Sequence, residues 1–400
     1  MSRNVPKLRF KGFEDEWKEK KMALLGTFLK GNGISKSDLS ESGKECILYG
    51  ELYTTYGEVI ESIKSKTDIS LKNEVLSKIN DVIIPSSGES AIDIATASCV
   101  MKDNILLGGD LNVFRSNKDN GVFISYQLNN SKKKDIAKIA QGASVVHIYN
   151  EQLKQLKVNI PSLQEQEKIA NFLSKVDSII EKQEKKVEYW NSYKKGMMQK
   201  IFSQKIRFKD ENGMDYPEWK INKIENIATI EMGFTPSTKN DEAWNGNIEW
   251  LSIAGMNSKY IYSGNKKISS EILGKRKLVP IDTLIMSFKL TIGRLAIVKK
   301  EIVTNEAICQ FYWKSKDISN EYMYAYLSVI NIESFGCRAA KGITLNTESL
   351  NSIVVKLPCL EEQTKIANFL SNIDNIIEKE SKKLEELKQW KKGLLQQMFV

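Results

Sequence analysis

Short runs of Lys, Arg, Ser, Thr and Tyr lie beside glycines at several places in the chain, and such residues can bind a polyanion. Their side chains can donate hydrogen bonds to phosphates, and some can also contact the edges of nucleotide bases. The candidates in the second half are Thr235, Ser237, Thr238, Lys239, Lys289, Thr291, Arg294, Arg338, Lys341 and Thr344. Those in the first half are Lys30, Asn32, Ser35, Lys36, Tyr49, Tyr53, Tyr56, Ser86, Ser87, Gln141 and Ser144. Any single one is more simply explained as a solvated loop residue, so the interpretation rests on the clusters.

Aromatic residues near these clusters allow two interpretations. Trp244, Trp250, Tyr260 and Tyr262 can stack on bases, but packing in a hydrophobic core is the commoner role of such side chains. We therefore favour core packing for them.

Residue types typical of catalytic sites are scarce. His147 is the only histidine, which argues against a histidine-based metal cluster or charge relay. The five cysteines include no CxxC pair, so we expect reduced, packing thiols. The sequence has no glycine-rich cofactor loop after a first strand, no GxxxxGK[S/T] phosphate loop and no Asp/Asn-Pro-Pro-aromatic tetrad for holding adenine. An independent methyltransferase or nuclease is thus disfavoured, and we expect no catalytic residues, metal site or cofactor in this chain.

Composition sets the scale of the fold. A chain of 400 residues with 41% hydrophobic content is long enough for two hydrophobic cores. The net charge of +9 suits a polyanionic partner but is weak evidence alone. No run of about 18 uncharged apolar residues occurs, and no secretory signal is recognisable. We expect a cytoplasmic protein without membrane contact.

The elements that must position the candidates form an internal repeat. Residues 161–202 align without a gap to residues 358–399 at a constant shift of 197, and 24 of these 42 positions are identical. Two weaker similarities accompany this repeat. An alternating apolar run precedes each copy, and each half opens with a related segment, RFKGFEDEWK in the first and RFKDENGMDYPEWK in the second. The chain thus consists of variable segment, helix, variable segment, helix.

Both repeated segments have the 4-3 apolar spacing of a coiled-coil seam. The seam positions are Ile169, Leu173, Val176, Ile180, Val187 and Trp190 in the first copy, and Ile366, Leu370, Ile373, Ile377, Leu384 and Leu387 in the second. Both copies place polar residues at the same two gaps, Gln183 and Lys194, and Glu380 and Lys391. A helix lying on its own domain's core is the alternative, but the matching seams favour pairing with each other.

Duplication predicts a pseudo-twofold relation, in which the two helices run antiparallel. About 38 helical residues form a rod of roughly 57 Å. Two domains held apart by such a rod could address sites about one turn of DNA apart, roughly 34 Å. A heptad inserted into either helix is expected to alter that spacing or to abolish recognition, without changing the bases that each domain reads.

The variable segments read as α/β (α+β) domains with short β-rich runs. We predict domain boundaries at 1–160, 161–202, 203–357 and 358–400, with strands such as IEWLSIA and DTLIMSF and a late helix, NEYMYAYLSVI. The fold class is therefore two copies of an α/β recognition domain joined by two long antiparallel coiled-coil helices.

The repeated PxxxEQxKIAxFLxxID helices, each preceded by a variable domain, resemble the conserved regions of type I restriction-modification specificity subunits. In the second domain, MGFTPSTKNDEAWNGNIEWLSI, SFKLTIGRLAI, VTNEAICQF and AAKGITL are similar to a common target-recognition-domain pattern of that family. In the first domain, LKGNGISKSDL and YGELYTTYGE resemble another subtype, which departs further from that pattern.

The resemblance implies a non-catalytic subunit that binds double-stranded DNA. Each domain would read one half of a split site, and the helices would hold two methyltransferase subunits and set the unread spacer. Restriction subunits would join this core, and S-adenosylmethionine, ATP and Mg²⁺ would belong to the partners. A structural alternative is a helical scaffold whose two variable domains bind other proteins.

Overall fold

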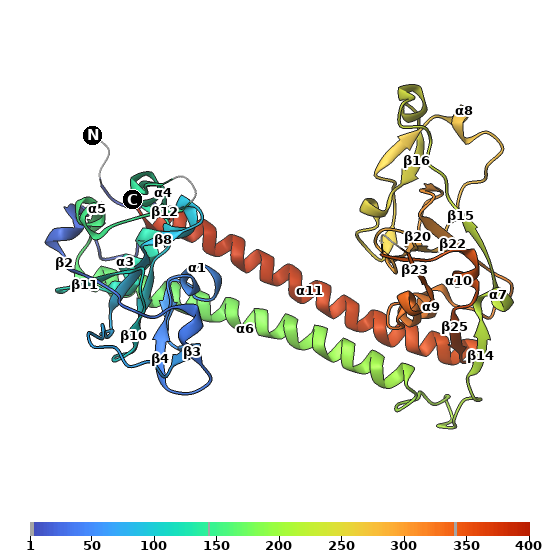
Figure 1. Cartoon of the computed structure of the whole chain (residues 1–400), viewed down its shortest axis with the longest axis horizontal. Coiled ribbons are helices and arrows are strands. Elements are labelled where there is room, and N and C mark those ends of the chain that lie inside the picture. The colour runs from blue at the N-terminus through green and yellow to red at the C-terminus, as the bar shows by residue number, and fades with distance from the viewer. Residues whose placement is uncertain (1–3, 143–144, 340–341) are drawn as a thin grey trace. The chain divides into compact units, whose positions relative to one another are not determined.

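The computed structural model describes residues 4–142, 145–339 and 342–400, and the chain forms two compact units (Figure 1). The first unit combines residues 1–185 with residues 381–400, and the second contains residues 186–380. The units differ from the four segments predicted from the sequence, because each long helix contributes to both.

Short strands around a central mixed sheet form the first unit. Its strands are β1 (Lys18–Lys21), β2 (Gly26–Lys30), β3 (Leu39–Ser40), β4 (Lys44–Ile47), β5 (Val59–Ile60), β6 (Ser65–Thr67), β7 (Asp81–Pro85), β8 (Ser87–Gly88), β9 (Ser98–Val100), β10 (Leu106–Leu107), β11 (Leu111–Ser116), β12 (Val146–His147) and β13 (Lys157–Ile160). Its shorter helices are η1 (Met22–Leu24), η2 (Lys36–Asp38), α1 (Glu51–Thr54), α2 (Ala91–Ile94), α3 (Gly121–Asn129), α4 (Lys133–Ile139) and α5 (Asn150–Gln155). The central sheet has the order β2-β11-β7-β9-β5, and a smaller sheet has the order β10-β4-β6-β3.

The second unit repeats this plan. Its strands are β14 (Lys220–Lys223), β15 (Ala228–Met232), β16 (Ile248–Leu251), β17 (Tyr260–Ile261), β18 (Lys266–Ile268), β19 (Leu284–Ser287), β20 (Leu295–Val298), β21 (Val303–Thr304), β22 (Ile308–Trp313), β23 (Cys337–Ala339), β24 (Gly342–Thr344) and β25 (Val354–Leu357). Its shorter helices are α7 (Ile224–Ile227), η3 (Asp241–Trp244), η4 (Ile253–Gly255), α8 (Ser270–Leu273), α9 (Asn320–Leu327), η5 (Ile332–Phe335) and α10 (Thr347–Asn351). The central sheet has the order β15-β22-β19-β20-β17.

The two central sheets correspond strand by strand. In each, the first four strands in sheet order pair antiparallel, and the fifth pairs parallel with the fourth. Each unit also closes with one antiparallel ladder, β1 with β13 and β14 with β25. The predicted internal repeat is therefore confirmed at the level of topology, although the two domains differ in sequence.

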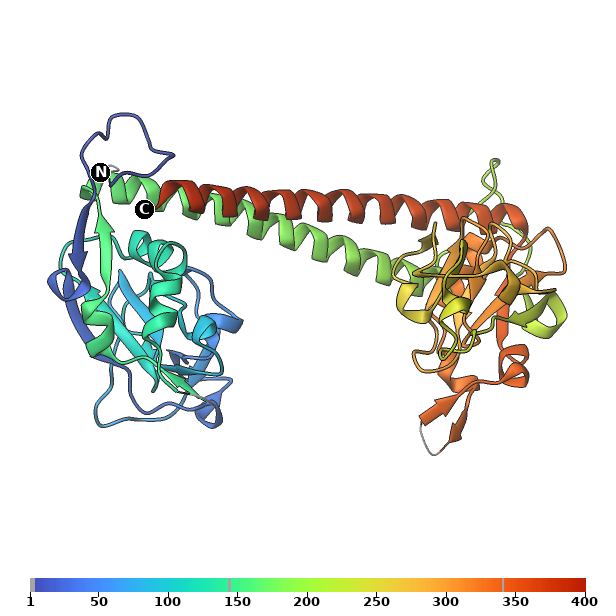
Figure 2. The same cartoon turned by 90° about the horizontal axis from the view of Figure 1, so that it is seen from above.

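Two long helices, α6 (Leu163–Phe202) and α11 (Leu360–Met398), correspond to the repeated sequence. Each follows a proline closely, Pro161 or Pro358, and carries acidic residues in its first turn, where carboxylates interact favourably with the helix dipole. Within each unit the α6 segment (green) lies beside the α11 segment (red) (Figure 2). Ion pairs show that the segments run antiparallel, because Asp177 pairs with Lys391 while Glu184 pairs with Lys388.

The seam residues of the long helices contact each other, as predicted, and they also pack on the domain cores, which was the alternative. In the first unit, Ile169, Leu173 and Val176 of α6 share one apolar cluster with Leu394 and Met398 of α11 and with core residues of the domain. The second unit has an equivalent apolar cluster. It contains Ile366, Leu370 and Ile373 from the start of α11, Ile201 and Phe202 from the end of α6, and Tyr322 from the domain. Each fully buried side chain of this kind contributes about 1.5–3 kcal/mol. Ile180 belongs to the first unit's cluster and is buried as well. The other seam positions are half-buried; they are Val187, Trp190, Ile377, Leu384 and Leu387.

None of the helices in the described part of the chain combines the length and the apolar character required to cross a lipid bilayer.

Candidate nucleic-acid interface

One edge of the second domain's central sheet gathers the predicted loops. β15 and β19 both end at this edge and β22 begins there, since Met232 pairs with Cys309, and Ser287 pairs with Ile308. The loop after β15 and the loop between β19 and β20 therefore lie next to the turn before β22. These two loops contain seven of the ten candidates in this domain, which are Thr235, Ser237, Thr238, Lys239, Lys289, Thr291 and Arg294.

The loop after β15 is tied to that turn by backbone and side-chain hydrogen bonds. Phe234 N donates to Thr304 O at 2.8 Å, Asn305 Nδ2 donates to Thr235 Oγ1 at 2.7 Å, and the Thr235 hydroxyl donates to Glu306. A Cβ on Gly233 would stand 1.9 Å from Thr304 O. Only glycine allows this approach, which explains the Met-Gly-Phe sequence at the end of the strand.

Two tryptophans support the same loop from beneath. Trp250 is buried and its Nε1 donates to Phe234 O at 2.9 Å, while Trp244 Nε1 donates to Ser237 O at 3.1 Å. Their rings meet edge to face at 4.9 Å. The preference for core packing thus describes both residues. Tyr260 is half-buried and bonds Glu321 at 2.9 Å, whereas Tyr262 is 67% exposed.

The basic residues of the second domain are exposed at this edge. Lys239, Lys289 and Arg294 are all exposed. One guanidinium nitrogen of Arg294 donates to Ile253 O at 3.0 Å, which leaves its other nitrogens available to an anion. These cations suit phosphate contacts.

A hairpin of β23 and β24 carries the remaining candidates, and Figure 2 shows it projecting from the rest of the second unit (orange). Arg338 lies in β23 and Thr344 in β24. Lys341 lies outside the described residues.

The first domain presents an equivalent edge. Lys30 ends β2 and is exposed, and Gly31 follows it where Gly233 follows β15. A Cβ on Gly31 would stand 2.0 Å from Gly108 O, so both glycines are required by the same close approach. Beyond it, Asn32 Nδ2 donates to Asn73 O at 2.9 Å.

A short 3₁₀ turn, η2, completes this loop. The Ser35 hydroxyl and backbone N–H both donate to Asp38, at 2.6 and 2.8 Å, and these bonds lower the pKa of that carboxyl. Ser35 is therefore a turn former as well as a candidate, while Lys36 is exposed beside it.

The three tyrosine candidates differ in exposure. Tyr53 in α1 is exposed, while Tyr49 and Tyr56 are half-buried against an apolar cluster. Tyr56 accepts a hydrogen bond from Lys64 N at 2.9 Å, and burial raises its pKa to about 12. Tyr53 thus presents the most accessible ring for contact with a ligand.

Ser86 and Ser87 lie inside the domain, contrary to the expectation that they face a ligand. They are 3% and 5% exposed, and their hydroxyls donate to the Asp110 carboxylate at 3.4 and 2.9 Å. Ser87 lies in β8, where it pairs with His147 of β12. Gln141 is exposed on the far side of this ladder, and Ser144 lies outside the described residues.

Residues of the repeated motif anchor each domain to its helix. Glu165, at the start of α6, accepts from Arg9 at 2.7 Å and from the Trp17 ring N–H at 3.4 Å. Glu362 of α11 accepts from Arg207 at 2.9 Å and from Trp219 at 2.9 Å. Both carboxylates are buried. The Arg and Trp come from the related segments that open each half, so these segments are structural.

The glutamine after each glutamate caps the domain's main helix. Gln166 accepts from Asn120 N, and Gln363 accepts from Ser319 N, each at 2.9 Å. Asn120 and Ser319 are the N-cap residues of α3 and α9. The repeated Glu-Gln pair thus fixes the position of each recognition domain on the first turns of its own helix.

A lysine at one polar gap of each seam forms an equivalent ion pair. Lys194 contacts Asp374 at 2.5 Å, and Lys391 contacts Asp177 at 2.7 Å. Both pairs lie within single units, and their members are related by the repeat shift of 197. Each of these lysines begins a Lys-Lys-Gly sequence, at residues 194–196 and 391–393, and each pairs inside the molecule.

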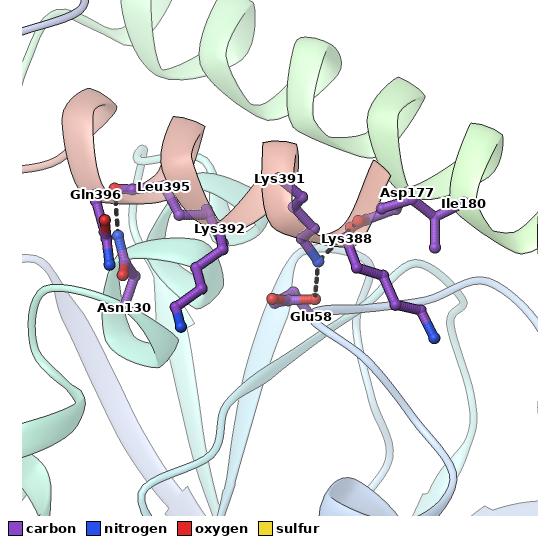
Figure 3. Close-up of a pocket in the computed structure, with 9 residues that line it drawn as sticks. All are labelled: Glu58, Asn130, Asp177, Ile180, Lys388, Lys391, Lys392, Leu395 and Gln396. Atoms are coloured by element: carbon purple, nitrogen blue, oxygen red, sulfur yellow. Dashed lines mark hydrogen bonds and ion pairs between the residues drawn. The ribbon is translucent and has the colours of Figure 1, made fainter. Parts of the chain in front are cut away.

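In the first unit, a residue of the domain joins the ion pair between Lys391 and Asp177. Lys391 also contacts Glu58 at 2.9 Å, so this lysine lies between two carboxylates (Figure 3). In addition, Tyr126 donates a hydrogen bond to Asp177 at 2.5 Å. Burial raises the pKa of Asp177. Burial opposes the charge on Lys391 as well, but Glu58 and Asp177 outweigh this effect and raise its pKa. In the first unit, Glu58 lies directly before β5. The equivalent position in the second unit, directly before β17, is Lys259, which pairs with Glu321 at 2.7 Å.

A family model described as the type I restriction modification DNA specificity domain matches residues 14–189 and 216–389. The chain belongs to this family. Each match contains one recognition domain and most of its long helix, so the specificity domain occurs twice. The resemblance inferred from the sequence is confirmed.

Relatives and solved structures agree with this assignment. The chain is 26% identical over 369 residues to the type I restriction enzyme MjaVIII specificity subunit of Methanocaldococcus jannaschii, covering 87% of this chain and 84% of the relative. It is 30% identical over 307 residues to the putative MjaX specificity subunit of the same organism, covering 73% and 70%. The crystal structure of the S subunit from M. genitalium shares the fold with a TM-score of 0.60 at 16% identity, over 99% of each chain.

Two groups of residues were not singled out by type and spacing. Asn305 and Glu306 organise the Thr235 loop from a remote turn, and Asp110 organises the first domain's edge. The buried Glu165 and Glu362 were visible only as part of a repeated motif. The sequence does contain one signal for their role. The partners of both glutamates recur at the start of each half, as the Arg of an Arg-Phe pair and the Trp of a Glu-Trp pair.

Proposed function

We propose that this chain selects the DNA sequence on which a type I restriction-modification complex acts. Each specificity domain reads one half of a split site in double-stranded DNA through the loops at its sheet edge. The observation that carries this proposal is the duplicated edge: two sheets of identical topology present loops with different residues, as readers of two different base strings require.

The paired helices serve as spacer and as platform in this proposal. Two methyltransferase subunits bind along α6 and α11, and restriction subunits join that core. S-adenosylmethionine, ATP and Mg²⁺ are held by these partners, and this chain performs no catalysis. Two similar proteins support such an assembly. The MjaVIII relative is a specificity subunit of a type I restriction enzyme, and a second solved structure, with a TM-score of 0.57 at 15% identity, concerns complex assembly of the type I system.

The test is co-expression of this chain with its methyltransferase in a host free of DNA methylation, followed by mapping of modified adenines by single-molecule sequencing. We expect a two-part motif with a fixed unread gap. The absence of new methylation from a soluble, co-purified complex would instead favour a scaffold that binds two proteins.

A longer helix pair should change the gap. Each unit contains a segment of both helices, so seven residues must be inserted into both, after Lys185 and after Glu380, to preserve the contacts in each unit. The insertion adds about 10 Å, or about three base pairs. We expect the same half-site letters with an altered gap, or loss of recognition, in the methylation map. An unchanged gap would contradict the spacer role. Insertion into α6 alone is the comparison, because it misaligns the paired segments.

A further inference from the structure

Leu290 is the most exposed large apolar side chain among the described residues, at 94%. It lies in the loop between β19 and β20, at the sheet edge that carries Thr235 and Arg294. An apolar side chain in full contact with water gains nothing for the folded state. Single exposed apolar side chains are common on protein surfaces, so the backbone conformation of Leu290 and its neighbours decide whether it has a role.

The backbone at Leu290 is unusual as well. Its φ of 64° is in the left-handed region, and the other described non-glycine residues with positive φ are Asn, Asp or Gln. A leucine in this conformation is strained, whereas glycine is not. Strained residues of this kind are maintained when the surrounding structure fixes them, and they concentrate at functional sites.

The loop holds this conformation with its own hydrogen bonds. Gly293 N donates to Ser287 O at 2.9 Å and Arg294 N donates to Ser287 Oγ at 3.0 Å, while the Ser287 hydroxyl donates to Thr291 O. Phe288 is buried and its N–H donates to Ala307 O at 3.0 Å. Both ends of the loop are thus fixed, and Leu290 projects between them.

The residues beside Leu290 indicate what it meets. Lys289 and Arg294 are exposed cations and Thr291 is an exposed hydroxyl, which suit a phosphate backbone. A side chain between such contacts points to the groove, where apolar residues contact thymine methyl groups or base faces.

On the basis of the proposed function, we propose that Leu290 is a base-contacting residue of the second domain, and that it reads DNA through apolar contact in the groove. The flanking cations fix the loop on the phosphates and supply the salt-dependent part of the affinity. Leu290 supplies a part that does not depend on salt.

The experiment compares Leu290→Ala and Leu290→Asn in the complex with methyltransferase. Asparagine tolerates the left-handed conformation, so this variant keeps the loop while removing the apolar surface. We expect binding to the wild-type motif to weaken about tenfold, as for loss of one buried apolar side chain, with an unchanged salt slope. The methylation map should relax in one half-site only.

Two further variants serve as controls. Ile281→Ala removes another exposed apolar side chain, 55% exposed, from the opposite end of β19, and should behave as wild type. Lys289→Ala should reduce the salt slope by about one. A wild-type motif and affinity in both Leu290 variants would overturn this inference alone. A wild-type complex that marks no two-part site would overturn the proposed function and this inference with it.

Discussion

Replacing Glu362 with alanine should lower the melting temperature of the second unit by about 5 °C. The buried carboxylate accepts hydrogen bonds from Arg207 and from Trp219. Its removal leaves the indole N–H without its acceptor and leaves the guanidinium with only Glu218 and two backbone carbonyls. Breaking a buried pair costs about 3–5 kcal/mol. Arg207 is 18% exposed, so part of its charge is resolvated. We therefore expect a loss of about 2 kcal/mol, with each 1 kcal/mol shifting the melting temperature by about 2–4 °C.

The matched control is Glu218→Ala. Glu218 also contacts Arg207, at 3.4 Å, but its side chain is 90% exposed, and such pairs contribute about 0–1 kcal/mol. Differential scanning calorimetry of both variants gives the comparison. Equal shifts would show that Glu362 is no more important than a surface carboxylate.

Replacing Lys391 with methionine should destabilise the first unit, and the loss should depend on pH. The substitution leaves Glu58 and Asp177 close together without their cation. Because both side chains are partly exposed, we expect a loss of about 2 kcal/mol at pH 7. Burial raises the folded-state pKa of Asp177. Acidification protonates this carboxylate and removes the repulsion that the variant leaves, so the difference from wild type should shrink as the pH falls through the pKa of Asp177.

The alkaline limit follows from the lysine itself. Its folded-state pKa is raised above the ordinary value of 10.5, so its stabilising contribution is fully present below about pH 10.5 and is lost as the pH rises through the folded value. Melting curves at pH 5, 7 and 9 test the acidic side of this window, and a curve recorded above pH 10.5 tests the alkaline side. Lys388→Met is the control, since Lys388 pairs with Glu184 at 47% exposure and should cost less than about 0.5 kcal/mol at each pH. A Lys391 effect of the same size as this control would contradict the assigned role.

Local patterns in the sequence predicted much of this fold. The 4-3 spacing placed both long helices, and β-rich runs placed β16 and β19, because the residue pattern of an element is a local property of the sequence. Glycines after β2 and β15 marked the loops that gather at the sheet edges. The prediction of the helix seam was also correct, although the seam residues contact the domain cores as well as each other.

Long-range contacts account for what was missed. Ser86 and Ser87 follow a strand and precede a glycine, which predicts an accessible turn. Instead, residues 146–147 pair with this segment, and both hydroxyls bind the Asp110 carboxylate. The Glu165–Arg9 and Glu362–Arg207 pairs each join residues about 155 positions apart. No local periodicity encodes such a pair, and only the recurrence of both members in both halves indicates it.

The first unit is built from two separated stretches of chain, and this affects the order in which the protein can fold during synthesis. Phe399 packs against Trp17 and Phe123 at ring distances of 6.3 and 5.4 Å, beside Leu394 and Met398. The ribosome therefore releases nearly the whole chain before the first domain's core is complete. Residues 186–380 are contiguous and can complete their core earlier. Although domains usually fold in the order of their synthesis, this protein should finish its N-terminal domain last.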